Sequence, residues 1–241
     1  MARRHSMRAD GACATPDRAV EIYLVRHAEA RTTGIDRFAD TGLTATGVSQ
    51  ARKLAEALCE VEFAACLSSP LRRSRETAEL LVEGRDIPLR VDPSLAEGLP
   101  GELTGLSESE ARARYPDDFR LGTTVVARIA SMGRTAPGGE TRVAFLERAE
   151  AAAQSVQREL EACDSRVLVV THGGLANYLL QLLLRMPARD EVPFGFDHCG
   201  LVRLLYYREA PGFGPFPMLR FGPPQRDPST DAPPGLSARL P

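Results

Sequence analysis

The sequence lacks the features that mark membrane, secreted or nucleic-acid-binding proteins. Only Lys53 among its 30 basic residues is a lysine, and 32 acidic residues bring the net charge to −2. A nearly neutral chain has no basic surface of the kind that binds nucleic acid or anionic membranes. The longest apolar run, near residues 179–184, is far too short to span a bilayer, and residues 1–19 lack the apolar core of a signal peptide. We therefore expect a cytoplasmic protein with no nucleic-acid or membrane partner.

Cysteine is also too scattered to build a structural framework. The five cysteines form neither a CxxC pair nor another metal-ligand spacing: Cys13, Cys59, Cys66, Cys163 and Cys199. An odd, dispersed set in a chain of 241 residues is typical of reduced thiols in the cytosol. The pattern predicts neither disulfides nor a cysteine-based metal centre.

Segments with strand and helix patterns alternate along the chain. Strands are predicted at 21–27, 64–68, 87–91, 166–172 and 200–208, with PMLRF (217–221) as an edge strand. Helices are predicted at 46–59 with Thr46 as cap, at 71–83 after Pro70, from Ser107 to Pro116 through a Ser107/Glu110 capping box, at 140–163 and at 173–185. This alternation predicts a layered α/β fold around one central, mostly parallel sheet.

The length and the 43% hydrophobic content suit one sizeable core. We place the folded domain at residues 20–222. Segments 1–19 and 223–241 are polar or rich in Pro and Gly, and we expect both to be unstructured.

Two apolar strands end in histidine. The first ends in Arg26-His27, and the second, about 145 residues later, ends in His172 followed by Gly173-Gly174. Ligands of α/β sheets bind beyond the carboxyl ends of the strands, so both rings are expected in one crevice. Arginine beside histidine suits a phosphate group, whose oxygens match the guanidinium fork. Two alternatives stay open from the residues alone: solvated loop histidines, and a zinc site, which lacks a third ligand at a typical spacing.

Six blocks in order resemble the histidine phosphatases, the phosphoglycerate mutase-like superfamily, over residues 21–205. The blocks are Arg26-His27-Ala28-Glu29, LTATGVSQARKLA (43–55), SSPLRRSRETAELL (68–81), LAEGLPGELTGL (95–106), PGGET (137–141) with Arg148, and VVTHGGL (169–175). The resemblance implies a three-layer α/β/α sandwich. Ala28, Ala30 and Thr33 depart from the usual Gly, Thr and Asn, and His198 stands where many relatives have a small or amide residue.

The resemblance also implies a role for each matching residue. His27 would be the nucleophile that forms a phosphohistidine, and Glu97 would be the proton donor, with Glu102 as the next acid to test. Arg26, Arg73 and His172, a cation or a hydrogen-bond donor, would bind the phosphoryl group, with Thr33 and Gly173 beside them. Without the resemblance, Arg73 in RRSR and Glu97 in its loop are interpreted as solvated residues. Ser68 and Ser69 are interpreted as strand-end and helix-cap residues. Glu140 and Arg148 are interpreted as an ion pair behind the site.

The implied activity is that of a metal-independent phosphatase with no cofactor, acting on a small phosphorylated metabolite. The alternatives are a phosphoglycerate-type mutase, a phosphohistidine protein phosphatase and an inactive domain that binds phosphorylated ligands. Mutases of the family carry a longer insert between the positions of Glu97 and Pro137, so this chain resembles the phosphatases more. The sequence identifies neither the substrate nor the role of His198, and it leaves the oligomeric state open, with a homodimer as one option.

Overall fold

The protein is described from a computed structural model that covers residues 20–31, 40–99, 101–116, 137–163, 165–186, 194–206 and 218–221. The two terminal segments predicted to be unstructured, 1–19 and 223–241, lie outside the described residues, as do Cys13 and Thr33.

The strands and helices predicted from the sequence are present, with ends shifted by a few residues. The strands are β1 (Val20–Arg26), β2 (Ala65–Ser68), β3 (Leu89–Val91), β4 (Arg166–Thr171), β5 (Leu201–Tyr206) and β6 (Met218–Phe221). The helices are α1 (Ala45–Ala57), α2 (Arg72–Val82), α3 (Glu108–Arg114), α5 (Arg142–Cys163) and α6 (Gly173–Leu183), with short 3₁₀ turns η1 (Pro93–Leu95) and η2 (Gly101–Leu103).

The described strands form one sheet in the order β3-β2-β4-β1-β5-β6. β1 pairs in parallel with β4 and antiparallel with β5, and β6 is antiparallel to β5. β5 is therefore the one described strand that runs against the others, which confirms a mostly parallel sheet. In the β1–β4 register Arg26 lies opposite Thr171, so the residues that follow both strands leave the sheet at the same edge.

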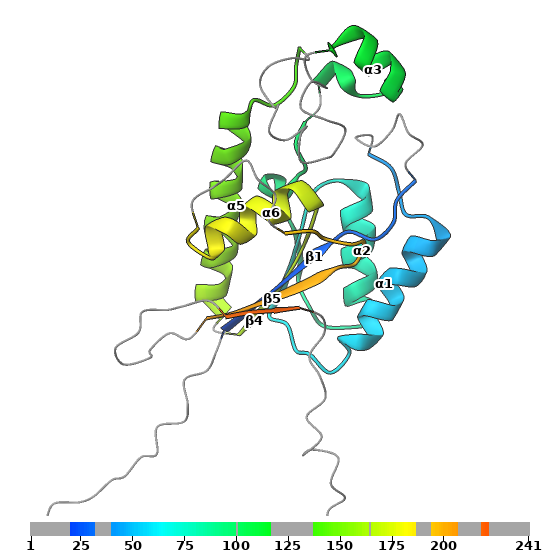
Figure 1. Cartoon of the computed structure of the whole chain (residues 1–241). Coiled ribbons are helices and arrows are strands. Elements are labelled where there is room, and N and C mark those ends of the chain that lie inside the picture. Colours follow the sequence, from blue (N-terminus) through cyan, green and yellow to red (C-terminus); the bar gives the residue numbers. More distant parts are fainter. Residues whose placement is uncertain are drawn as a thin grey trace, which may run out of the picture.

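Helices cover both faces of the sheet, which confirms the three-layer sandwich. Figure 1 shows α5 and α6 on one face and α1 and α2 on the other. The side chains of β1 alternate accordingly: Ile22 and Leu24 pack in the cluster that includes α5 and α6, and Tyr23 and Val25 pack in the cluster that includes α1 and α2. The same alternation carries on past the strand end and sends Arg26 and His27 to different sides.

The start of α1 differs from the prediction in one residue. Thr44, not Thr46, is the N-cap: its Oγ1 accepts from the Gly47 backbone N–H at 2.9 Å. Thr44 Oγ1 also donates to the Glu29 carboxylate at 2.6 Å, so the contact with Glu29 selects the earlier threonine. The predicted capping box of Ser107 and Glu110 is confirmed.

Candidate active site

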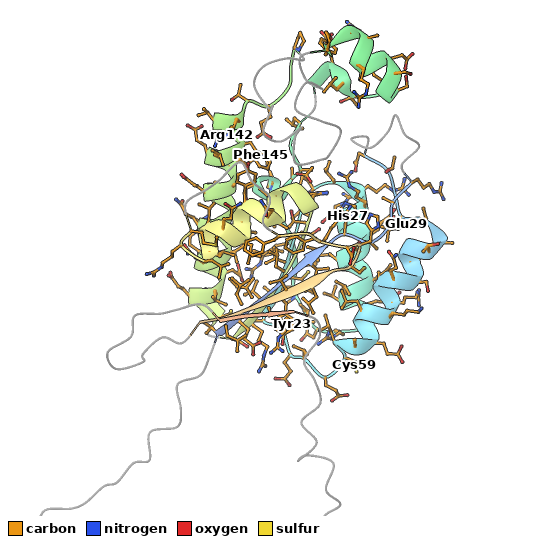
Figure 2. All side chains as sticks on the ribbon, in the orientation of Figure 1. Tyr23, His27, Glu29, Cys59, Arg142 and Phe145 are labelled. Carbon is orange, nitrogen blue, oxygen red and sulfur yellow. The ribbon has the colours of Figure 1, made fainter. Side chains whose placement is uncertain are left out.

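His27 directly follows β1 and is 7% exposed; Figure 2 shows it at the end of that strand. Its Nδ1 lies 2.7 Å from the Ala28 carbonyl oxygen, an acceptor, so Nδ1 carries the proton and Nε2 is the unprotonated ring nitrogen with a lone pair. Nε2 accepts a hydrogen bond from Arg73 Nε at 3.2 Å. Burial, and then the charges of Arg73 and Arg26, lower the pKa of His27 to about 3, against the opposing Ala28 hydrogen bond. The imidazole is thus neutral near pH 7, the state in which a histidine attacks phosphorus.

Arg73 stands in the first turn of α2 and is only 4% exposed, so it is not a solvated member of the RRSR run. Thr77, one turn later, fixes the helix against the nucleophile segment: its Oγ1 donates to the Arg73 carbonyl at 2.7 Å and accepts from the Ala28 N–H at 3.0 Å. Burial lowers the pKa of Arg73, and the charge of Glu97 opposes this shift. An arginine keeps its charge under such a shift, so a fixed cation faces His27 Nε2.

His172 is the N-cap residue of α6, and its ring centroid lies 5.0 Å from that of His27. The structure therefore brings the two strand-end histidines together as predicted. His172 Nε2 lies 2.7 Å from Ser69 Oγ, and Ser69 Oγ accepts from the Leu71 N–H. With the Ser69 O–H donating to Nε2, the proton of the neutral ring is on Nδ1. Burial, and then the charge of Arg73, lower the pKa of His172 well below its ordinary value, so of the two expected states the neutral hydrogen-bond donor is favoured over the cation.

Arg26 points to the α6 side of the sheet, against Gly173. Its Nη1 donates to the Phe196 carbonyl at 2.5 Å and its Nη2 to His198 Nε2 at 3.1 Å. A Cβ atom on Gly173 would lie 3.5 Å from Arg26 Nε. Gly173 therefore lies directly beside the Arg26 side chain, at a distance where an added Cβ would make ordinary van der Waals contact.

Glu97 lies in the loop after η1 and reaches the N-terminus of α6. Its two carboxylate oxygens accept from the backbone N–H groups of Gly174 at 3.0 Å and Leu175 at 3.2 Å. A helix N-terminus favours such a carboxylate. Its charge also acts on both Arg26 and Arg73, so Glu97 belongs to the same cluster and is not a solvated loop residue. Glu102, the reserve acid, is exposed and pairs with Arg114 at 2.8 Å.

The turn before β5 also belongs to the site, although its contacts with Arg26 were not predicted from the sequence. The Cys199 N–H donates to the Arg26 carbonyl at 3.1 Å, and the Gly200 carbonyl accepts from the Arg26 N–H at 3.1 Å. Cys199 has a φ of +55°, a left-handed conformation uncommon for a residue with a side chain. This turn places His198 on Arg26, with its ring centroid 5.8 Å from that of His27. The only sequence signal for this contact was that His198 stands where many relatives have a small or amide residue.

Three further observations bear on predictions made from the sequence. The four cysteines that the structure describes are free thiols. No helix in the described ranges is long and apolar enough to cross a membrane. Among the described side chains, no group of three or more His, Cys, Asp or Glu could hold a metal ion.

The sequence pattern of the histidine phosphatase superfamily (branch 1) matches residues 22–213, a span that includes the whole cluster around His27. The chain belongs to this superfamily. A 2,3-bisphosphoglycerate-dependent phosphoglycerate mutase 2 of Gloeobacter violaceus is 31% identical to it over 192 residues, 73% of this chain and 85% of that protein. An adenosylcobalamin/α-ribazole phosphatase of Salmonella typhimurium is 32% identical over 185 residues, 70% of this chain and 82% of that protein.

The fold of this histidine phosphatase is similar to that of solved members. A mycobacterial glucosyl-3-phosphoglycerate phosphatase superposes with a TM-score of 0.67 at 26% identity, covering 86% of this chain and 100% of that one. Family, fold and relatives together identify the protein as an enzyme, a phosphoric monoester hydrolase of the histidine phosphatase type.

Proposed function

We propose that this histidine phosphatase hydrolyses the phosphate monoester of a small metabolite through a phosphohistidine on His27. The observation that carries the proposal is the unprotonated Nε2 of the buried His27, which accepts a hydrogen bond from the buried Arg73 guanidinium. A nucleophile that is already neutral needs no base to activate it.

In the first step Nε2 of His27 attacks phosphorus, and the bond from phosphorus to the ester oxygen breaks. The phosphoryl group then carries its negative charge between Arg26 and Arg73, where fixed cations stabilise it best as that charge spreads over its oxygens. The imidazole becomes positive on transfer, and its Nδ1–H stays on the Ala28 carbonyl. His172 donates an N–H to the phosphoryl group. Two permanent cations supply the charge that a metal ion provides elsewhere, so we expect metal-independent activity without a cofactor.

The alkoxide that leaves needs a proton, and Glu97 gives it from its protonated form, becoming the carboxylate. In the second step water attacks the phosphohistidine, Glu97 takes a proton from that water, and inorganic phosphate departs. Oε1 of Glu97 accepts from the backbone N–H groups of Gly98 and Leu175, whereas Oε2 accepts from that of Gly174 and keeps a second lone pair for this proton. The start of α6 thus holds the acid and His172 side by side.

The names of two relatives, an α-ribazole phosphatase and a glucosyl-3-phosphoglycerate phosphatase, support a phosphorylated metabolite as the substrate. A second candidate activity is return of the phosphoryl group to a substrate hydroxyl, which the 31% identical mutase favours. Release of inorganic phosphate in proportion to substrate consumed separates the two. Glu97 disfavours a phosphohistidine protein phosphatase, because those relatives tend to lack that acid, and the clustered residues around His27 disfavour a merely ligand-binding domain.

The test is single-turnover transfer to His27 from an alkyl phosphate and from p-nitrophenyl phosphate, in wild type and Glu97→Gln. An alkoxide is a strong base and needs the proton, whereas p-nitrophenolate does not. We expect Glu97→Gln to slow transfer from the alkyl ester about 10²–10⁴-fold and to spare the aryl ester. Equal losses for both esters would refute an acid role for Glu97.

The His27→Ala variant is the control for the covalent step. Rapid quenching of wild type should trap an acid-labile phosphoenzyme that the variant cannot form. A full turnover rate in His27→Ala, or an acid-stable phosphoenzyme, would overturn the proposed mechanism.

A further inference from the structure

One arginine outside the phosphate cluster holds the backbone of the loop that carries Glu97. Arg148 extends from α5, and its Nη1 donates to the carbonyls of Ser94 at 3.0 Å and Ala96 at 2.5 Å. Its Nη2 donates to the carbonyl of Glu97 itself at 3.4 Å. A single guanidinium thus contacts the main chain before and at the proposed acid.

Glu140 completes the hydrogen bonding of this guanidinium. Arg148 Nε and Nη2 donate to the two Glu140 carboxylate oxygens at 2.8 and 2.6 Å. The five N–H groups of the guanidinium therefore match five acceptors, three carbonyl and two carboxylate oxygens. The Glu140 backbone N–H also donates to the Leu99 carbonyl at 2.9 Å, and its carboxylate accepts from the Leu99 N–H at 3.3 Å. The pair therefore fixes the loop on both sides of Glu97.

We propose that Arg148, oriented by Glu140, is a positioning residue that sets the place of the Glu97 carboxylate relative to the leaving group. The inference rests on the proposed function, in which Glu97 is the proton donor. Proton transfer requires hydrogen-bond reach, and a shift of about 1 Å costs about 10²-fold in rate. Side chains of the pair are 20% and 8% exposed, so water does not readily replace the lost donors.

Lysine cannot substitute for Arg148 in this arrangement. Its ammonium has three donors on one atom and no planar fork, so it cannot reach five acceptors on two sides. The conservative variant Arg148→Lys keeps the charge that acts on the phosphate cluster and removes the geometry. Arg148→Lys therefore separates the effect of positioning from the effect of charge. It also keeps the proposal testable if Arg148→Met does not fold.

The experiment compares single-turnover transfer from the alkyl and the p-nitrophenyl ester in Arg148→Met and Arg148→Lys. We expect both variants to lose about 10²-fold with the alkyl ester and little with the aryl ester, which is the signature of Glu97→Gln. The double variant Arg148→Met/Glu97→Gln should be no slower than Glu97→Gln alone, because both changes remove one function. Equal losses with both esters, or additive losses in the double variant, would overturn the inference.

The matched control is Arg203→Met. Arg203 forms a similarly buried pair with Glu21, with Nη2 2.7 Å from the carboxylate, but it lies opposite Tyr23 in the register of β5, away from the catalytic end of β1. This variant should lower the melting temperature and leave the ratio of alkyl to aryl rates unchanged. A change of that ratio in Arg203→Met would mean that the ratio reports stability, and the inference would fall.

The two proposals fail in different ways. If Glu97→Gln shows no preference between the esters, the acid assignment fails first, and the inference fails with it. If Glu97→Gln shows the preference and neither Arg148 variant does, only the positioning role is lost.

Discussion

We expect acidification to lower the free energy of unfolding, because His27 is buried and neutral in the folded protein. The pKa of this group is about 3 in the folded protein, against an ordinary value of 6.5. The unfolded chain therefore binds a proton on His27 at a higher pH than the folded chain does. Stability from this residue is complete above pH 6.5 and declines as the pH falls from 6.5 towards 3.

The two pKa values set the size of the effect. Between pH 7 and pH 4, linkage from 6.5 to about 3 removes about 3 kcal/mol from the free energy of unfolding. His172 contributes in the same direction, since its pKa is also lowered. The His27 share must therefore be isolated by difference.

The assay is urea unfolding from pH 4 to 7, in phosphate-free buffer, for wild type and His27→Asn. The variant retains His172, so the difference between the two curves reports His27. The ¹⁵N resonances of the imidazole, followed over the same range, give its titration directly. A midpoint near 6.5, or equal pH dependence in the two proteins, would refute the burial argument.

Two further predictions follow from the packing and the charge of the site. Gly47→Ala should destabilise the protein by about 1–3 kcal/mol, because the added Cβ would lie 2.0 Å from the Glu29 carbonyl oxygen. The control is Gly195→Ala, whose added Cβ meets nothing within 4 Å. Equal melting temperatures for the two variants would contradict the predicted clash. Activity should be indifferent to EDTA and inhibited by vanadate, which adopts the geometry of a phosphoryl group in transfer; activity lost to EDTA and restored by a divalent ion would contradict the role given to Arg26 and Arg73.

The sequence predicted the meeting of His27 and His172 because parallel strands deliver their carboxyl ends to one edge. Strand periodicity and the glycines after His172 were enough for that step. The burial of Arg73 was not evident from RRSR alone, since only the packing of α2 against Ala28 turns that side chain inward. The resemblance of residues 68–81 to the family identified Arg73 as a site residue, which the local pattern alone did not.

Contacts between residues far apart in the sequence account for the features of the site that were not predicted. Glu140 and Arg148 were predicted to pair, but nothing in local sequence relates Arg148 to carbonyl groups about 50 residues earlier. The contact of His198 with Arg26 depends on β5 lying beside β1, which periodicity does not specify. The error at Thr46 has the same origin, because the Glu29 contact decided between two similar caps.

The position of β1 between β4 and β5 also has a consequence for biosynthesis. β1 emerges from the ribosome before both of its partners, which end at Thr171 and Tyr206, near the other end of the domain. At 5–20 residues per second the strand that precedes the nucleophile waits roughly 7–29 s with both edges unpaired, until β4 is complete, and about 9–36 s until β5 is complete. An apolar strand with open edges is a site of aggregation, so slow translation or premature termination before β4 exposes this segment to association with other chains. The cluster of residues around His27 cannot form on a partly made chain, and a chaperone that shields Val20–Arg26 would protect the protein during that interval.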